Sequence, residues 1–143
     1  MKKQLATIIT SVAAVMVLTA VSANAQSDRN MTIDVPFEFV IAGETYGAGK
    51  YTIGRFNAQK PEILILKKKE GGEKKVFLTQ KMKSKTKVEN AHLVFSISGD
   101  SYSLSEIWTG GGEGGQQTVK SKSERKAQLR AKQEKMVLAA SLQ

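Results

Sequence analysis

The sequence contains no cysteine, and this absence excludes disulfide bonds, thiol nucleophiles and cysteine-ligated metal sites. A single histidine, His92, is present, whereas a metal site needs several ligands, so neither a metal nor another cofactor is expected. Aromatic residues make up only 6% of the chain. After residue 25 no apolar run is long enough to cross a membrane as a helix.

The first 25 residues have the pattern of a secretory signal peptide. Lys2 and Lys3 precede an apolar stretch, and Ala23-Asn24-Ala25 provides a small-residue cleavage site before Gln26. We therefore expect export, to the periplasm or the extracellular space, after cleavage near Ala25. The remaining 118 residues suit one domain with one core.

Positive charge is concentrated in two blocks. Residues 67–87 contain nine lysines and two glutamates, and residues 120–143 contain seven basic and two acidic residues. The rest of the chain after residue 25 has four basic and nine acidic residues. The sequence thus predicts a mildly acidic body that carries two basic segments.

The hydrophobic pattern predicts an all-β domain. Apolar residues alternate with polar ones over residues 31–41, with Pro36 in the outward phase, and further strands are expected near 50–56, 63–66, 74–84, 93–98 and 102–108. Residues 63–66, Ile-Leu-Ile-Leu, are apolar in both phases, which predicts burial on both faces. The short turns between these segments favour an antiparallel barrel or sandwich of about six strands within residues 26–109.

Residues 110–115, Gly-Gly-Gly-Glu-Gly-Gly, contain the spacing of a nucleotide-binding fingerprint but not its context. The first helix-capping signal is Ser121 with Glu124, several residues too late to place a phosphate on a helix N-terminus. We therefore interpret residues 110–120 as a glycine-rich linker and residues 121–143 as a basic C-terminal helical tail.

Catalytic chemistry is not indicated by the sequence. The serines at 96, 98, 101, 103 and 105 follow strand alternation and lack a G-x-S-x-G elbow. A small hydrolase that uses His92 as a base is therefore the third-ranked possibility, and no catalytic residue is assigned.

Two charged residues occupy positions in the apolar phase of their strands. Arg55 shares a phase with Tyr51 and Ile53, and Glu106 shares one with Leu104 and Trp108. If both face the core they should form a buried pair, because an unpaired buried charge is costly. The alternative is that a bulge or a strand end returns each charge to solvent.

Lysine occupies every second position from 81 to 87, so an extended chain would point four lysines in one direction. With the neighbouring hairpin lysines they form a candidate polyanion-binding strip, consisting of Lys67, Lys68, Lys69, Lys74, Lys75, Lys81, Lys83, Lys85 and Lys87. The alternative is a lysine-guarded edge strand that prevents aggregation. Sequence-specific nucleic-acid recognition is not expected, because aromatic stacking residues are scarce in this segment.

Three short segments resemble a group of small secreted β-proteins from soil bacteria. They are Val35–Phe39 (V-P-F-x-F), Ala48–Tyr51 (A-G-x-Y) and Ser105–Trp108 (S-E-[VI]-W), the last of which precedes a glycine-rich stretch. The resemblance implies secretion and a β fold, and it implies no activity.

These observations favour a non-catalytic exported β-domain that associates with anionic envelope or extracellular material through a lysine-rich edge. The expected partner is an acidic polysaccharide, a lipid phosphate or another envelope component. A periplasmic inhibitor or protein-interaction module that uses the loops around residues 43–49 is the alternative.

Overall fold

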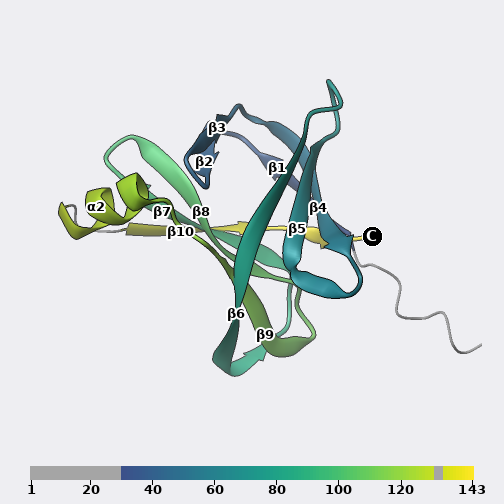
Figure 1. Cartoon of the computed structure of the whole chain (residues 1–143). Coiled ribbons are helices and arrows are strands. Elements are labelled where there is room, and N and C mark those ends of the chain that lie inside the picture. The colour runs from purple at the N-terminus through teal and green to yellow at the C-terminus, as the bar shows by residue number, and fades with distance from the viewer. Residues whose placement is uncertain (1–29, 131–133) are drawn as a thin grey trace, which may run out of the picture.

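The computed structural model describes residues 30–130 and 134–143, so the predicted signal peptide lies outside the described residues. The described chain forms one open, eleven-stranded sheet and a short helix (Figure 1). The strands are β1 (Met31–Val35), β2 (Phe39–Ile41), β3 (Glu44–Tyr46), β4 (Gly49–Asn57), β5 (Lys60–Lys68), β6 (Lys74–Val88), β7 (His92–Ser98), β8 (Ser101–Trp108), β9 (Gly112–Thr118), β10 (Glu134–Ala139) and β11 (Ser141–Leu142), and the helix is α2 (Lys122–Arg130). The all-β prediction is confirmed. Of the two expected architectures, barrel or sandwich, the closed barrel is wrong because the sheet is open, and the expected number of about six strands is too small.

The additional strands arise in four places, one of which is β3, a short strand that pairs with β2. The segment 31–41 is divided into β1 and β2 around Pro36, which cannot donate a ladder hydrogen bond. The predicted glycine-rich linker contains β9, which pairs with both β6 and β8. The predicted helical tail forms α2 and then returns to the sheet as β10 and β11.

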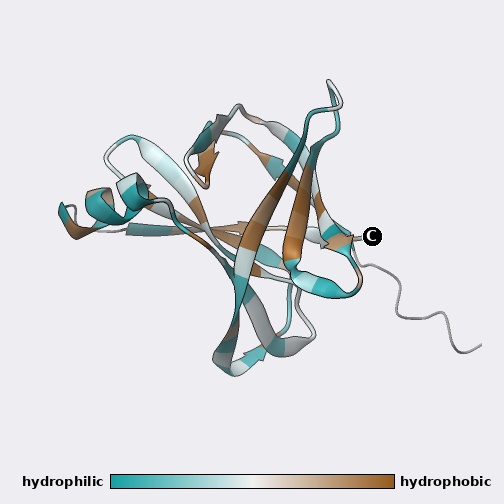
Figure 2. Ribbon diagram, viewed as in Figure 1, coloured by the Kyte–Doolittle hydropathy of each residue, from teal (hydrophilic) through white to brown (hydrophobic). Residues whose placement is uncertain are grey.

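The predicted helix start is confirmed in atomic detail. The amide of Ser121 donates a hydrogen bond of 2.6 Å to the Glu124 carboxylate, and the Glu124 amide donates one of 3.2 Å to the Ser121 hydroxyl. This is a reciprocal capping box. Helix α2 has no buried residue, and Figure 2 shows that it is mostly hydrophilic.

Strand β6 connects the two halves of the sheet. Its first part, Lys74–Leu78, pairs with β5, and its second part, Thr79–Lys83, pairs with β9. In Figure 1 β6 runs from the β5–β6 turn at the top to its pairing with β9 at the bottom. Strands β4, β5, β1 and β11 continue the sheet on one side of β6, and β9, β8, β7 and β10 continue it on the other.

Both halves of the sheet contribute to a single core. Phe39 lies near its centre, with its ring 5.2 Å from that of Tyr51 and 5.7 Å from those of Phe95 and Tyr46. Ile53 and Leu66 enter this core from one half of the sheet. The core therefore depends on contacts between strands that are distant in sequence.

The last described segment forms both end strands of the sheet path. β10 pairs with β7, β11 pairs with β1, and only Ala140 separates β10 from β11. The Ala140 amide donates a 3.0 Å hydrogen bond to the Ala91 carbonyl. Figure 1 shows this segment crossing behind other strands to reach the C-terminus, where β11 pairs with β1.

A bulge changes the phase of β8. Leu104 pairs with Phe95 but Glu106 pairs with Val94, which leaves Ser105 as the extra residue. As a result Leu104 and Ile107 both belong to the core cluster, and Glu106 does not share the inward face of Leu104.

Candidate functional site

The nine predicted site lysines fall into two groups at opposite ends of β6. Lys67, Lys68, Lys69, Lys74 and Lys75 surround the β5–β6 turn, and Lys81, Lys83, Lys85 and Lys87 lie in the second part of β6 (Figure 1). From Lys74 to Lys87 an extended strand spans roughly 43 Å. Lys74–Leu78 of β6 pair with β5 and Thr79–Lys83 pair with β9, so in the described residues each of these parts has a strand neighbour on one side, and the nine lysines lie in two groups and not along one continuous edge.

The lysines of the second group have different surroundings. Lys83 forms an ion pair of 3.0 Å with Glu113 of β9. Lys85 and Lys87 are exposed, in a part of β6 where the register with β9 shifts between Lys83 and Val88. Lys81 lines a cavity that is described below.

The lysines of the turn divide between the two faces of the sheet. Lys75 pairs with Glu44, and the Lys68 ammonium lies 5.9 Å from the ring centre of Tyr51. Lys67 and Lys74 lie on the other face of the sheet from Lys68 and Lys75. Both are exposed, and neither has an ion-pair partner among the described residues.

The outer surface of β4, β5 and β6 is amphipathic. Four apolar side chains share this face according to the strand register, with Ile63 opposite Leu78 and Ile65 opposite Val76. A fifth, Phe56, follows the inward-phase residue Arg55 at the irregular end of β4. Phe56 and Leu78 are each 57% exposed and Val76 is 42% exposed. Next to the apolar rows, Lys67 lies opposite Lys74. We call this surface the amphipathic face; it comprises Phe56, Ile63, Ile65, Val76, Leu78, Lys67 and Lys74.

The prediction that Ile-Leu-Ile-Leu is buried on both faces is wrong, and the reason is instructive. Leu64 and Leu66 point into the core, whereas Ile63 and Ile65 are only partly buried on the outer face. A run that is apolar in both phases fits either two buried faces or one buried and one exposed apolar face. Sequence reasoning therefore missed the apolar part of the amphipathic face.

The amphipathic face has two features that are unfavourable for an isolated domain. Large apolar side chains gather in contact with solvent, and like charges lie directly opposite each other at Lys67 and Lys74. Directly opposed like charges destabilise a strand pair, and clustered exposed apolar surface marks interaction sites.

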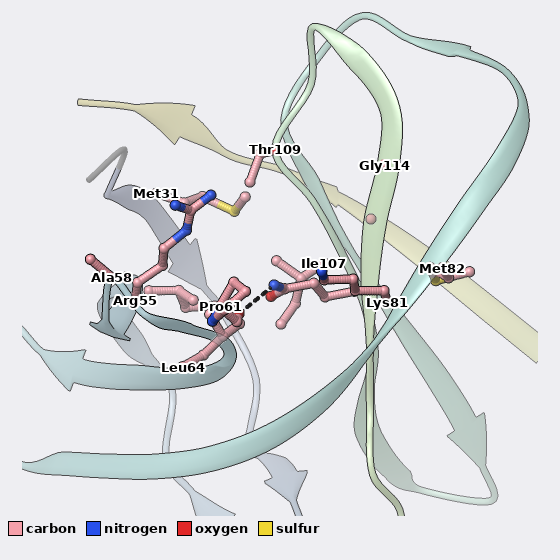
Figure 3. Close-up of a pocket in the computed structure, with 14 residues that line it drawn as sticks. Met31, Arg55, Ala58, Pro61, Leu64, Lys81, Met82, Ile107, Thr109 and Gly114 are labelled. Atoms are coloured by element: carbon pink, nitrogen blue, oxygen red, sulfur yellow. Dashed lines mark hydrogen bonds between the residues drawn. The ribbon is translucent and has the colours of Figure 1, made fainter. Parts of the chain in front are cut away.

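A cavity of about 730 Å³ opens on the inner side of the sheet (Figure 3). Its floor consists of apolar residues that are each less than 5% exposed, namely Met31, Ile53, Leu64 and Ile107. The Gln116 amide donates a 2.7 Å hydrogen bond to the Pro61 carbonyl, which connects β9 to β5 beside the cavity. Arg55 from β4 and Lys81 from β6 enter from different walls (Figure 3).

The predicted buried pair between Arg55 and Glu106 is not among the ion pairs of the described residues. Arg55 keeps the inward phase of Ile53 but lies where β4 ends and its register shifts, so the side chain is exposed. The bulge in β8 turns Glu106 out of the phase of Leu104. Arg55 thus corresponds to the alternative in which a strand end returns the charge to solvent, whereas the Glu106 side chain is only 13% exposed and pairs with Lys135 instead.

Glu106 instead belongs to a polar cluster. Its carboxylate accepts hydrogen bonds of 2.8 Å from Lys135 of β10 and 3.0 Å from the Trp108 indole. Partial burial acts to raise the pKa of Glu106, but these two hydrogen bonds outweigh it, so the pKa lies below its ordinary value. The role of this cluster is to attach β10 to β8.

His92 is occupied by structural contacts. Its ring stacks on Trp108 at a centroid distance of 6.2 Å, and Nδ1 lies 3.0 Å from the Asn90 carbonyl. Among the hydrogen bonds of residues 30–130 and 134–143, none joins His92 to a serine. Within the same ranges no group of three or more His, Asp or Glu side chains is arranged to hold a metal ion.

Comparison with known proteins identifies no relative: neither a family model, nor a curated protein, nor a solved structure matches this chain. In the described part of the chain, no helix has the length and hydropathy of a membrane span. Two surfaces therefore stand out on physical grounds alone, the amphipathic face outside the sheet and the cationic cavity within it.

Proposed function

We propose that this protein is a non-catalytic, exported β-domain that binds anionic envelope material, and that it docks on anionic lipid through the amphipathic face. The observation that supports the proposal is the register of β5 and β6, which places four apolar side chains beside Lys67 and Lys74 on one surface, with the exposed Phe56 at the end of the neighbouring strand β4. Lipid phosphate attracts the lysines, while the interfacial region of a bilayer accepts the apolar side chains.

The amphipathic face distinguishes a lipid surface from a soluble polyanion. A polysaccharide would engage the lysines alone and leave Phe56, Val76 and Leu78 in water, because it offers no apolar phase. Binding to lipid removes both unfavourable features, since the phosphates offset the Lys67–Lys74 repulsion and the acyl boundary covers the apolar rows.

Vesicle co-sedimentation tests this proposal. The form that begins at Gln26 is mixed with vesicles of phosphatidylglycerol and phosphatidylcholine, or of phosphatidylcholine alone. Replacing Lys67 and Lys74 with Gln should lower the partition coefficient for the anionic vesicles roughly 30-fold at low salt, because each lysine near an anionic surface contributes about 1 kcal/mol. Replacing Lys85 and Lys87 with Gln removes the same charge elsewhere on β6 and should change binding much less.

The apolar side chains are tested separately. Replacing Val76 and Leu78 with Thr preserves strand propensity and should weaken binding to anionic vesicles while leaving elution from a heparin column unchanged. If this variant binds vesicles like the natural protein, docking is purely electrostatic and the lipid proposal is wrong. The amphipathic face is also excluded as the site if both lysine double variants lose vesicle binding equally.

A further inference from the structure

We propose that the cavity on the inner side of the sheet binds a single-chain amphiphile with an anionic headgroup. In this arrangement Arg55 and Lys81 hold the headgroup at the mouth, and the apolar floor contacts the chain. This site differs from the amphipathic face in its residues and in its side of the sheet.

The positions of the two cations support the proposal. Arg55 continues the inward phase of Tyr51 and Ile53, and Lys81 continues that of Phe77 and Thr79. In both strands the preceding inward side chains are buried. Arg55 and Lys81 are the next inward residues, and they lie where the interior opens to solvent. Two strands thus each carry a charge into the same cavity.

Neither cation has an ion-pair partner among the described residues. Two like charges on the walls of one cavity repel each other, and a bound anion would offset this repulsion. A guanidinium matches carboxylate and phosphate in a two-point geometry, and an ammonium adds a point charge. These groups therefore favour a carboxylate or a phosphate headgroup.

The floor and the dimensions of the cavity indicate an apolar chain on that headgroup. Met31, Ile53, Leu64 and Ile107 provide hydrocarbon surface beneath the cations. About 730 Å³ lies within the range of roughly 300–1,000 Å³ that is usual for ligand pockets. A small inorganic anion would leave this apolar surface without contact.

Gly114 leaves space at the cavity wall. It shares a phase with Gln116, whose side-chain amide donates a hydrogen bond to the Pro61 carbonyl beside the cavity, and a Cβ added at Gly114 would meet no atom within 4 Å. Its backbone does not require glycine, because its φ is not in the left-handed range. A larger side chain at this position should therefore fill the cavity without disturbing the sheet.

Titration calorimetry with soluble amphiphiles tests the proposal. The natural protein should bind dodecanoate and dodecyl phosphate, below their micelle-forming concentrations, at least ten times more tightly than dodecyl maltoside or acetate. Replacing Arg55 and Lys81 with Gln should weaken dodecanoate binding at least tenfold and leave the weak maltoside binding unchanged. The control variant, with Lys85 and Lys87 replaced by Gln, has the same net charge and should bind like the natural protein. Comparing dodecanoate with dodecyl phosphate shows which headgroup is preferred.

A steric test is independent of charge. Gly114→Leu should lower the affinity for every dodecyl ligand at least tenfold, and Ala58→Phe, on another wall of the cavity, provides a second block if the first variant does not fold. The proposal is overturned if the natural protein binds no dodecyl anion, if the Arg55 and Lys81 substitutions leave binding intact, or if the control loses binding equally. Vesicle binding of the same variants tests the docking proposal separately, because none of the substituted residues belongs to the amphipathic face. Failure of the cavity proposal can therefore be distinguished from failure of the docking proposal.

Discussion

Gly115 should be the most sensitive glycine of β9, because Trp108 packs over it. A Cβ built at Gly115 would lie 2.5, 2.7 and 2.8 Å from three atoms of the indole ring, where carbon atoms normally approach to about 3.5–4.0 Å. Trp108 is 6% exposed, stacks on His92 and donates to Glu106, so its ring cannot move aside freely. Gly115→Ala should therefore reduce the free energy of unfolding by about 1–3 kcal/mol, the usual range for overpacking.

The adjacent glycine provides a matched control. Gly114→Ala adds the same methyl group on the opposite face, where no atom lies within 4 Å. It should be neutral or stabilise the protein by up to about 1 kcal/mol, because alanine restricts the unfolded chain more than glycine does. The two variants therefore differ in the environment of the added methyl group and not in its chemistry.

Urea unfolding followed by far-ultraviolet circular dichroism measures both variants. With a slope of about 1–3 kcal/mol per molar urea, the two midpoints should differ by roughly 1 M. Replacing Trp108 with Phe in a double-mutant cycle should reduce the penalty of Gly115→Ala, because the two side chains then interact less. Equal midpoints for the two alanine variants would refute the assigned packing of Trp108 on β9.

The remaining predictions concern protonation and processing. Because the pKa of Glu106 is lowered in the folded state, its carboxylate stabilises the fold at pH values above its ordinary pKa. Glu106→Gln should therefore reduce the free energy of unfolding by about 1–2 kcal/mol near pH 7. The difference from the natural protein should disappear as the pH falls below about 4. Burial, aided by a hydrogen bond to a glutamate, raises the pKa of Tyr46, and burial also raises that of Tyr51, so absorbance titration at 295 nm should show these phenols ionising later than free tyrosine. Stability should accordingly fall as the pH rises above about 10, and less steeply in Tyr46→Phe. Mass spectrometry of the exported protein should find Gln26, free or cyclised, at the N-terminus, and a mature chain that retains Met1 would contradict export by cleavage.

Local patterns predicted most of the individual strands. The alternation in residues 93–98 and the capping box at Ser121 each depend on neighbours within a few residues, and both are found in the structure. The strands that were missed have weak local signals. Strand β9 contains three glycines and no large apolar residue, and it is stabilised by pairing with β6 and β8 and by the packing of Trp108 on Gly115.

The sequence by itself determined the all-β class, the absence of thiol chemistry, the concentration of lysine and the phase of Arg55, because these follow from composition and from the alternation of side chains along one strand. Only the tertiary structure decided which strands are neighbours. Pairing between β5 and β6 brings Lys67 opposite Lys74, the bulge at Ser105 separates Glu106 from Arg55, and the approach of β4 to β6 across the cavity brings Arg55 and Lys81 to the same opening. The physical reason is that strand register and sheet order are set by contacts between residues far apart in the chain, whereas alternation and capping are set by the nearest neighbours.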